Sequence, residues 1–408
     1  MLTQPITGKR RWAPAAAGCV VVAALLALRL WFSGLIPGAW MADFSVYYAG
    51  GRAVLEGTPL YDLNFGTAEI PFPFTYSPFA ALVFVPLTSL GPAGASVAWT
   101  AVNFASLAAV VWLTLGLLRV RRRGLLTAGW TVAVLVLDPV VLNLAVGQIN
   151  IIVAALVLLD FSRVLPERWR GIALGIAAGV KLIPLIFIVY LAFTGRGKTA
   201  LRAGLSFAGT IAFGFLLLPS DSVRYWVHGV VFQSGRTLHS IAVNQSLPGF
   251  FARLAGTDVA PGWTWPVTVL AGVLGLALGV RAHRRGQELV GLLVVAFTSL
   301  VVSPIVWAMH AIWIVPGLLW LCHARWQRGR VLLPRVVFAA TVVLYLVPLY
   351  ELVQGVDRYQ NTVPGNLLAT FGGVLAKTLL MLVSVLFWLP RLRAESSAEP
   401  VPESAGTG

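Results

Sequence analysis

The sequence predicts an all-α protein that crosses a membrane about twelve times, and three observations lead to this fold class. Of the 408 residues, 58% are hydrophobic and 11% charged, whereas about a quarter of a soluble domain is charged. Apolar segments of roughly 20 residues, the length of a spanning helix, recur between Ala15 and Leu389. The mean hydropathy is +0.84, and the positive charges fall in short gaps between the apolar segments.

The positive charges also predict a topology. A soluble protein with a net charge of +15 would be a candidate for nucleic-acid binding, but here Lys and Arg cluster beside apolar segments. We therefore expect these clusters to lie in the cytoplasm against anionic headgroups, with no nucleic-acid partner. Both termini are predicted to be cytoplasmic, as residues 1–14 and a disordered tail of residues 394–408. The basic clusters lie at residues 9–11, 119–123, 163–170, 196–202, 281–285 and 325–335.

Between the two termini, residues 15–393 are predicted to form one multi-spanning domain in the cell membrane. Residues 171–193 lie between two basic clusters, so a single span there would break the charge rule. We expect instead a hairpin of two short helices that turns near Lys181 and Pro184. The other spans are predicted at residues 15–36, 93–118, 125–144, 149–164, 203–219, 263–281, 289–305, 310–322, 331–350 and 365–389.

Two long segments are predicted to lie outside the cytoplasm. Residues 37–92 carry four acidic residues and one basic residue and lack a long apolar run, so they form the first outer loop. Within this loop, residues 43–56 are expected to be a short amphipathic helix on the membrane, and residues 76–90 a segment that dips into it. The second outer loop is residues 220–262.

Asp43 is the first candidate for chemistry, because it begins the first outer loop in the string Trp40-Met41-Ala42-Asp43-Phe44. A carboxylate among aromatic side chains has a raised proton affinity, which suits a general base. The alternative is a helix N-cap, where Asp is favoured. Both roles are compatible with the sequence.

Aromatic and amide side chains gather in two further strings. Tyr76 lies in a loop-to-helix junction that ends in Ser77-Pro78, and its ring could also stack on the apolar face of a sugar. Gln148 and Asn150 lie at a predicted outer turn, where polar residues are common, and their amides could also bind sugar hydroxyls.

Several cations and one histidine could serve a phosphate or the reaction. Lys181 lies at the turn of the predicted hairpin, where it could contact a phosphate or extend to the interface. In the second outer loop, Arg236, His239 and Arg253 could neutralise a phosphate or be ordinary loop residues. His310 begins a span on the same side as Asp43, so it has either a structural or a functional role.

The sequence lacks the motifs of several common enzyme classes. The chain has no Walker A loop, no dinucleotide-binding glycine motif and no Asp-x-Asp pair for a metal-bound nucleotide sugar. Its five histidines lack metal-ligand spacing, so we expect neither a metal nor another cofactor.

Taken together and in order, several strings resemble glycosyltransferase family 87. This is a family of multi-spanning, C-type (GT-C) transferases rich in actinobacterial polyprenol-phosphate-mannose-dependent α-(1→2)-mannosyltransferases. The strings are Asp43-Phe44-Ser45-Val46-Tyr47-Tyr48, Gly57-Thr58-Pro59-Leu60-Tyr61, Phe74-Thr75-Tyr76-Ser77-Pro78, Gly147-Gln148-Ile149-Asn150, Lys181 with Pro184, Asn244-Gln245-Ser246, and Ser303-Pro304 with Trp307 and His310.

The resemblance implies an inverting transfer of mannose from polyprenyl-phosphate-mannose to a glycolipid, phosphatidylinositol mannoside or lipomannan, on the outer face. It implies that Asp43 is the general base and that His310 is the second His of a pattern resembling S-P-x-S-W-x-H-H. Here Val306 and Met309 replace the second Ser and the first His of that pattern. The candidate donor-phosphate residues are Lys181, Arg236 and Arg253; the candidate sugar and acceptor residues are Tyr47, Tyr76, Gln148, Asn150, Asn244, Gln245 and Trp307.

Alternatives remain at this stage. Within the class, the donor could carry another sugar, for example a pentofuranose. Outside it, the chain could be a lipid or solute transporter, although transporters commonly show repeated halves and this sequence shows none. A non-catalytic membrane subunit is a third possibility, which loss of product on changing Asp43 would distinguish from an enzyme.

Overall fold

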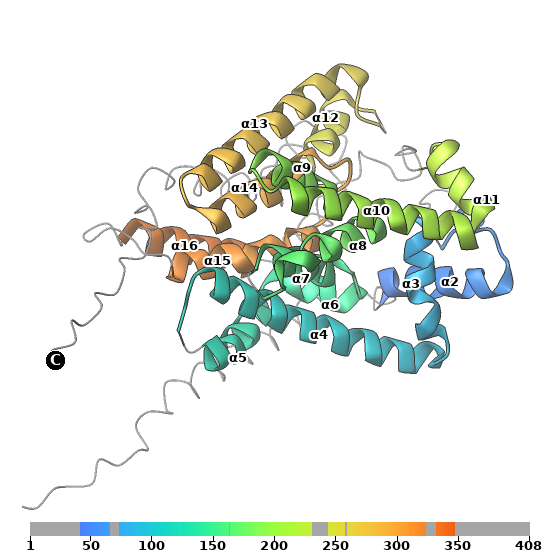
Figure 1. Cartoon of the computed structure of the whole chain (residues 1–408), viewed down its shortest axis with the longest axis horizontal. Coiled ribbons are helices and arrows are strands. Elements are labelled where there is room, and N and C mark those ends of the chain that lie inside the picture. Colours follow the sequence, from blue (N-terminus) through green and yellow to red (C-terminus); the bar gives the residue numbers. More distant parts are fainter. Residues whose placement is uncertain are drawn as a thin grey trace, which may run out of the picture.

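The computed structural model describes residues 41–65, 73–121, 123–162, 164–230, 244–257, 259–323 and 332–346. In these ranges every regular element is helical, apart from one isolated bridge between Asn64 and Pro73, so the all-α class is confirmed there (Figure 1). The α-helices are α2 (Ala42–Glu56), α3 (Pro78–Thr88), α4 (Gly91–Leu117), α5 (Arg123–Ala133), α6 (Asp138–Val146), α7 (Asn150–Phe161), α8 (Ile172–Val180), α9 (Leu185–Phe193), α10 (Gly197–Leu217), α11 (Pro219–Ser222), α12 (Leu247–Ala255), α13 (Trp265–Arg284), α14 (Glu288–Val302), α15 (Ile314–His323) and α16 (Leu332–Leu346). Short 3-10 helices are η2 (Leu60–Asp62), η3 (Val134–Val136), η4 (Glu167–Trp169), η8 (Gly262–Thr264) and η9 (Ala308–Trp313), and η5 (Val223–Val227) is a π-helix.

Three helical stretches in the described part of the chain are long and apolar enough to cross a membrane. They are α4, α10, and η8 with α13, and the bent pair α5–α6 would make a fourth. The chain is therefore a membrane protein by the length and apolar character of its helices. The predicted spans at residues 15–36 and 365–389 lie outside the described residues, and the total of about twelve stays a prediction.

The predicted span over residues 125–144 is not one continuous helix. The chain bends by 83° between α5–η3 and α6, and Leu137 at the break is extended. Pro139 is the cause, because it lacks the N–H that would continue the preceding helix and is tolerated in the first turn of the next one. The break ends in the turn that carries Gln148 and Asn150.

The predicted hairpin over residues 171–193 is confirmed as two short helices, α8 and α9, with Lys181 and Pro184 in the break. Helix α8 packs closely on α10 through Gly171, Gly175 and Gly179, which recur every four residues. A Cβ atom at Gly175 would lie 2.5 Å from the carbonyl oxygen of Ala203 in α10. This contact fixes the end of α8 and hence the start of the break.

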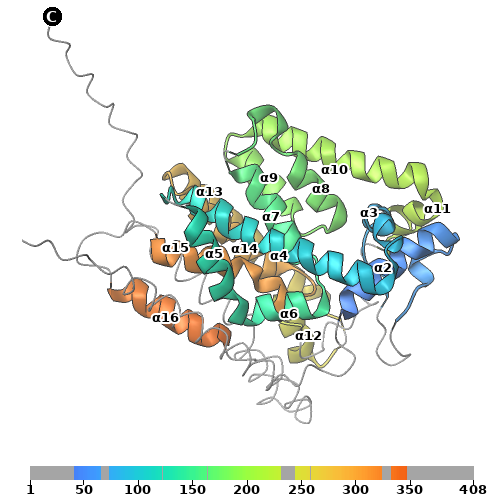
Figure 2. The same cartoon turned by 90° about the horizontal axis from the view of Figure 1, so that it is seen from below.

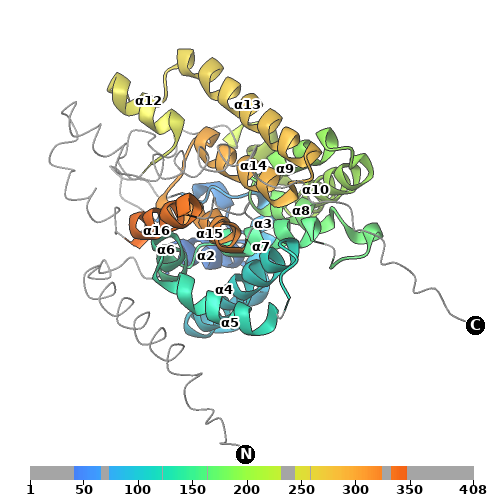
Figure 3. The same cartoon turned by 90° about the vertical axis from the view of Figure 1, so that its left-hand side faces the viewer.

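Figures 1 and 2 show α7 and α8 between the two long helices α4 and α10, with α2 and α3 against one end of that pair. Figure 3 shows α13 at one edge of the molecule, with α14 packed beneath it. The largest apolar cluster lies among α4, α7, α14 and α15. This core supports three segments that meet near Asp43: the α6–α7 turn, the α8–α9 break and η9.

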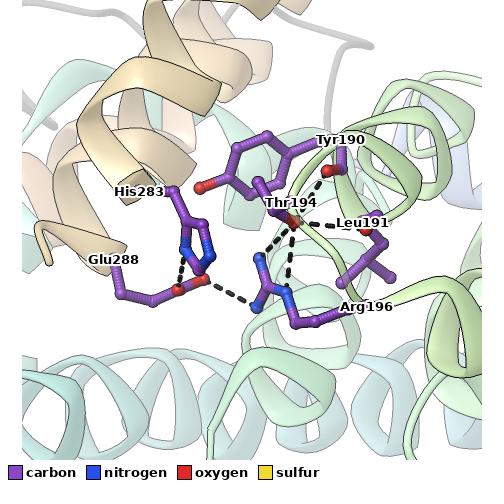
Figure 4. Close-up of polar contacts among 6 residues, drawn as sticks. All are labelled: Tyr190, Leu191, Thr194, Arg196, His283 and Glu288. Atoms are coloured by element: carbon purple, nitrogen blue, oxygen red, sulfur yellow. Dashed lines mark hydrogen bonds and ion pairs between the residues drawn. The ribbon is translucent and has the colours of Figure 1, made fainter. Parts of the chain in front are cut away.

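A polar cluster joins the turn after α9 to the start of α14 (Figure 4). Glu288 accepts Nη1 of Arg196 at 2.8 Å and Nδ1 of His283 at 2.6 Å. The Arg196 guanidinium also donates to Oγ1 of Thr194 and lies 5.5 Å from the Tyr190 ring centroid. The charges of this cluster are mutually compensated, and it ties the α8–α9 hairpin to the α13–α14 pair.

Candidate active site

Asp43 lies in the first turn of α2, and its carboxylate is buried. The N-cap position belongs to Met41, and no side chain caps this helix, so the N-cap interpretation of Asp43 is wrong. Instead, Oδ2 of Asp43 accepts the Nε2 of Gln148 at 3.0 Å. The carboxylate is therefore oriented by the α6–α7 turn.

Gly147 makes this contact possible. It ends α6 with φ of 69°, a left-handed conformation that glycine adopts without strain. A Cβ there would also lie 2.6 Å from Cβ of Phe44, so α2 approaches the turn closely only because the side chain is absent. The turn is further held by Trp99, whose Nε1 donates to the Gly147 carbonyl at 2.6 Å.

Two tyrosines complete what we call the Asp43 network: Asp43, Tyr47, Tyr76 and Gln148. Oε1 of Gln148 accepts the hydroxyl of Tyr47 and, at 3.2 Å, that of Tyr76. The two hydroxyls lie 2.8 Å apart, and the Tyr47 ring stacks on Phe84 at 4.7 Å between centroids. The network thus links α2, α3 and the α6–α7 turn.

The electrostatic setting of Asp43 suits proton abstraction. Burial raises the pKa of Asp43 to about 6, although the Lys181 ammonium and the Gln148 hydrogen bond both lower it. Burial and the negative charge of Asp43 raise the pKa of Tyr76, so this phenol stays protonated. A carboxylate that is ionised at neutral pH but binds a proton more readily than an exposed Asp is fit to act as a base.

A second group, the Lys181 network, consists of Lys181, Asn150 and His310. Nζ of Lys181 donates to Oδ1 of Asn150 at 2.6 Å and lies 3.2 Å from Nε2 of His310. It also lies 6.0 Å from the centroid of the Tyr76 ring, which connects the two networks. An ammonium near a buried carboxylate can stabilise negative charge that develops on a neighbouring group.

Asn143 belongs to this site but was not predicted from the sequence. Its Nδ2, like that of Asn150 at 3.1 Å, donates to the Met309 carbonyl next to His310. The signal was available, because Asn143 is a polar residue in an apolar segment and lies seven residues before Asn150.

The remaining predicted residues have different surroundings. The Asn244 side chain accepts Val306 N and donates to the Pro304 carbonyl, both at 3.0 Å, and Gln245 N donates to the Val306 carbonyl at 2.6 Å. Arg253 is buried, and its Nη1 donates to the Asn244 carbonyl at 2.7 Å. These contacts fix the Ser303–Val306 segment that leads to η9.

Three predicted residues remain, namely Trp307, Arg236 and His239. The indole Nε1 of Trp307 is buried and has no hydrogen-bond partner among the described residues, so it can donate to a ligand. Arg236 and His239 lie outside the described residues. The structure therefore brings together Asp43, Tyr47, Tyr76, Gln148, Asn150, Lys181 and His310.

Sequence comparisons connect this arrangement to known proteins. The profile of glycosyltransferase family 87 matches residues 74–304. The chain is 34% identical over 329 residues to the polyprenol-phosphate-mannose-dependent alpha-(1-2)-phosphatidylinositol mannoside mannosyltransferase of Mycobacterium tuberculosis (strain ATCC 25618 / H37Rv), an overlap of 75% of this chain and 76% of the relative.

Two other relatives are similar over most of their length. The Mycolicibacterium smegmatis protein of the same name is 34% identical over 315 residues, which is 70% of each chain. A polyprenol-phosphate-mannose-dependent alpha-(1-2)-phosphatidylinositol pentamannoside mannosyltransferase of Mycobacterium tuberculosis (strain CDC 1551 / Oshkosh) is 32% identical over 330 residues, 78% of this chain and 75% of the relative. No solved structure matches the chain significantly.

Proposed function

This chain belongs to glycosyltransferase family 87, and from that premise we propose that it transfers mannose from polyprenyl-phosphate-mannose to a phosphatidylinositol mannoside through an α-(1→2) linkage. The enzyme class, the donor and the glycolipid acceptor follow from the relatives, which are 34% identical to the chain over 76% and 70% of their lengths. The observation that carries the site assignment is the buried Asp43 carboxylate beside the Lys181 ammonium.

The proposed reaction is a single displacement with inversion. Asp43 removes the proton of the acceptor 2-hydroxyl, and that oxygen attacks the anomeric carbon of a β-linked mannosyl phosphate from the opposite face. The bond between the anomeric carbon and the phosphate oxygen breaks, and polyprenyl phosphate leaves with the electron pair. The product is the α-linked mannoside, and Asp43 then returns its proton to solvent.

Lys181 is the proposed partner of the leaving phosphate. Its ammonium is held by Asn150 and lies beside His310, and it retains hydrogen-bonding capacity because an ammonium has three donors. Electrostatic stabilisation of the leaving charge in a site with little water would be a large part of the catalysis. Arg253 and Arg236 of the second outer loop are further candidates for the phosphate.

The sugar-binding side of the site is proposed from position and polarity. Trp307 offers a buried N–H next to His310, and Tyr76 offers a ring between the two networks. We propose that the GT-C site faces the extracytoplasmic side, because residues 37–92 carry one basic residue against four acidic ones. We also propose that the reaction needs no metal, since the leaving phosphate has a protein cation.

The test is transfer of labelled mannose from polyprenyl-phosphate-mannose to phosphatidylinositol mannoside in membranes that hold equal amounts of wild type or Asp43→Asn. We expect transfer by the wild type and a loss of about 10³-fold or more in the variant, with donor binding retained. Asp62→Asn is the matched control, since Asp62 lies in the same loop but forms an exposed ion pair with Arg224. Full activity of Asp43→Asn would disprove the base assignment, and an inactive wild type would redirect the search to another sugar or acceptor.

A further inference from the structure

The α6–α7 turn contains two amides, Gln148 and Asn150, and both ends of each amide are engaged by protein. Both side chains are buried, with 4% and 7% of their surface exposed. They lie two residues apart, yet they bond different reacting groups: Gln148 bonds Asp43, and Asn150 bonds Lys181. One turn therefore touches both the carboxylate and the ammonium.

The orientation of the Gln148 amide is determined by its surroundings. Its Oε1 accepts three donors: the Tyr47 hydroxyl, the Tyr76 hydroxyl at 3.2 Å and the Ile149 N–H at 3.0 Å. A flipped amide would direct its N–H groups at the Ile149 N–H and its oxygen at the Asp43 carboxylate, which would replace attraction by repulsion. The Nε2 donor must therefore face Asp43.

Asn150 is fixed in a comparable way. Its Nδ2 donates to the Met309 carbonyl at 3.1 Å, and this leaves Oδ1 to accept Nζ of Lys181 at 2.6 Å. The same carbonyl also accepts Asn143, so the Asn150 anchor is itself held by a second amide. A lysine has four rotatable side-chain bonds, and an anchor of this kind restricts where its ammonium lies.

We propose that the α6–α7 turn is a positioning element for the reaction, in which Gln148 sets the place and proton affinity of the Asp43 base, Asn150 sets the place of the Lys181 cation, and neither amide binds the sugar. This inference rests on the proposed function, because it assigns roles relative to that base and that cation. Fixing two groups from one rigid turn keeps their separation constant, which is the geometric requirement of a concerted displacement.

Other charged and titratable groups near Asp43 also interact with its carboxylate. Lys181 faces it from the α8–α9 break and favours the ionised form, while Tyr47 and Tyr76 face it from α2 and from the segment before α3. His310 lies beyond Lys181 on η9. Variants that keep all these groups and remove only one amide therefore isolate the contribution of the turn.

The test compares Gln148→Met, which keeps the length of the side chain without its hydrogen bonds, with Asn150→Ala. Both full-length variants are purified in detergent, and mannose transfer is measured against donor concentration and against pH. The control is Asn103→Ala, which removes another buried amide, on α4, whose Nδ2 donates to the Trp99 carbonyl one turn earlier. Far-ultraviolet circular dichroism and elution volume establish that each variant is folded.

The two variants are expected to differ in which parameter changes. In Gln148→Met, loss of a donor to the carboxylate should move the acid limb of the kcat profile up by about one pH unit and lower kcat at pH 6. In Asn150→Ala, KM for the donor should rise about tenfold while the acid limb stays in place. Asn103→Ala should change neither.

Three outcomes would overturn the inference. They are an unmoved acid limb in Gln148→Met, a shift of the same parameter in both variants, or a loss of folded protein with unchanged kinetics of the remainder. If these occur while Asp43→Asn is inactive, the positioning inference fails and the proposed function stands. If Asp43→Asn is active, the base assignment on which the inference rests has failed, and if the wild type transfers no mannose, the proposed function itself has failed.

Discussion

Nζ of Lys181 and Nε2 of His310 lie 3.2 Å apart, so two basic nitrogens are within hydrogen-bond distance of each other. Nδ1 of His310 lies 3.3 Å from the Trp307 carbonyl, so an imidazole protonated at Nδ1 donates there and accepts the Lys181 ammonium at Nε2, which an imidazolium could not do. An imidazolium would also bring a second positive charge against the ammonium. His310 is therefore neutral in this arrangement, and we propose that it holds Lys181 and does not supply charge.

The first prediction concerns this role. His310→Gln keeps a polar side chain at Lys181 and should retain most of the transfer rate, whereas His310→Leu should lose about tenfold, the worth of one hydrogen bond to a charged group. Rates are measured with saturating donor and acceptor. His323→Leu is the control, since His323 accepts Nε1 of Trp130 away from the site. Equal rates for wild type and His310→Leu would remove His310 from the mechanism.

The second prediction is the pH dependence of the wild type. Asp43 must be ionised to accept a proton, and burial places its pKa at about 6. Lowering the pH through 6 protonates it, so kcat should fall about tenfold per pH unit below that value and level off above it. Measurement of kcat in proteoliposomes between pH 4.5 and 8 checks this. A rate that rises on acidification would exclude a carboxylate base.

The third prediction concerns the packing of α8 on α10. Gly175→Ala introduces a Cβ 2.5 Å from the Ala203 backbone oxygen, which cannot move without shifting α10, so the protein should lose about 1–3 kcal/mol of stability. Gly204→Ala is the matched control, because a Cβ there meets nothing within 4 Å. Thermal unfolding midpoints in detergent distinguish the two. A similar midpoint for both variants would show that the helices can separate without cost.

The fourth prediction separates stability from catalysis. Glu288→Gln leaves Arg196 and His283 without their carboxylate, so we expect the free energy of unfolding to fall by about 1–2 kcal/mol for a partly exposed group, measured as a lower unfolding midpoint, with unchanged kcat per folded molecule. Glu56→Gln breaks an exposed pair with Arg52 and should change stability by less than about 1 kcal/mol. A kcat effect specific to Glu288→Gln would connect this cluster to the reaction.

The fifth prediction follows from the proposal that a protein cation serves the leaving phosphate. A chelator such as EDTA should leave the initial rate of transfer unchanged, and added Mg²⁺ or Mn²⁺ should not raise it, because no metal carries the developing charge. The rate is measured after dialysis against the chelator. A rate lost in the chelator and restored by one divalent ion would contradict the proposal.

The sequence predicted much of the helical order because apolar length and basic gaps depend on local composition. The hairpin around Lys181 is the clearest case, since the charge rule excluded a single span and the structure has two short helices there. The bend at Pro139 was missed, although proline in an apolar run was a local signal for it. The N-cap was misplaced by two residues, which is the usual uncertainty of a helix end.

The membership of the site could be anticipated, but not the partners within it. Asp43, Gln148 and Lys181 were singled out by residue type and order. Gln148 bonds Asp43, which lies 105 residues away in the sequence, whereas Asn150 bonds Lys181, which lies 31 residues away. Which of these distant segments meet depends on the whole fold. No local pattern carries that information, and the role of both amides as sugar ligands stays a prediction beside the proposed positioning role.

The break between α8 and α9 affects the electrostatic field around Lys181. Lys181 is the C-cap of α8, and the carbonyl groups at a helix C-terminus carry a partial negative charge that attracts cations. Helix α9 starts at Leu185, and its N–H groups carry the opposite partial charge. The break therefore places the backbone of Lys181 between a partly negative helix end and a partly positive helix start, which a continuous helix through the same residues would not provide.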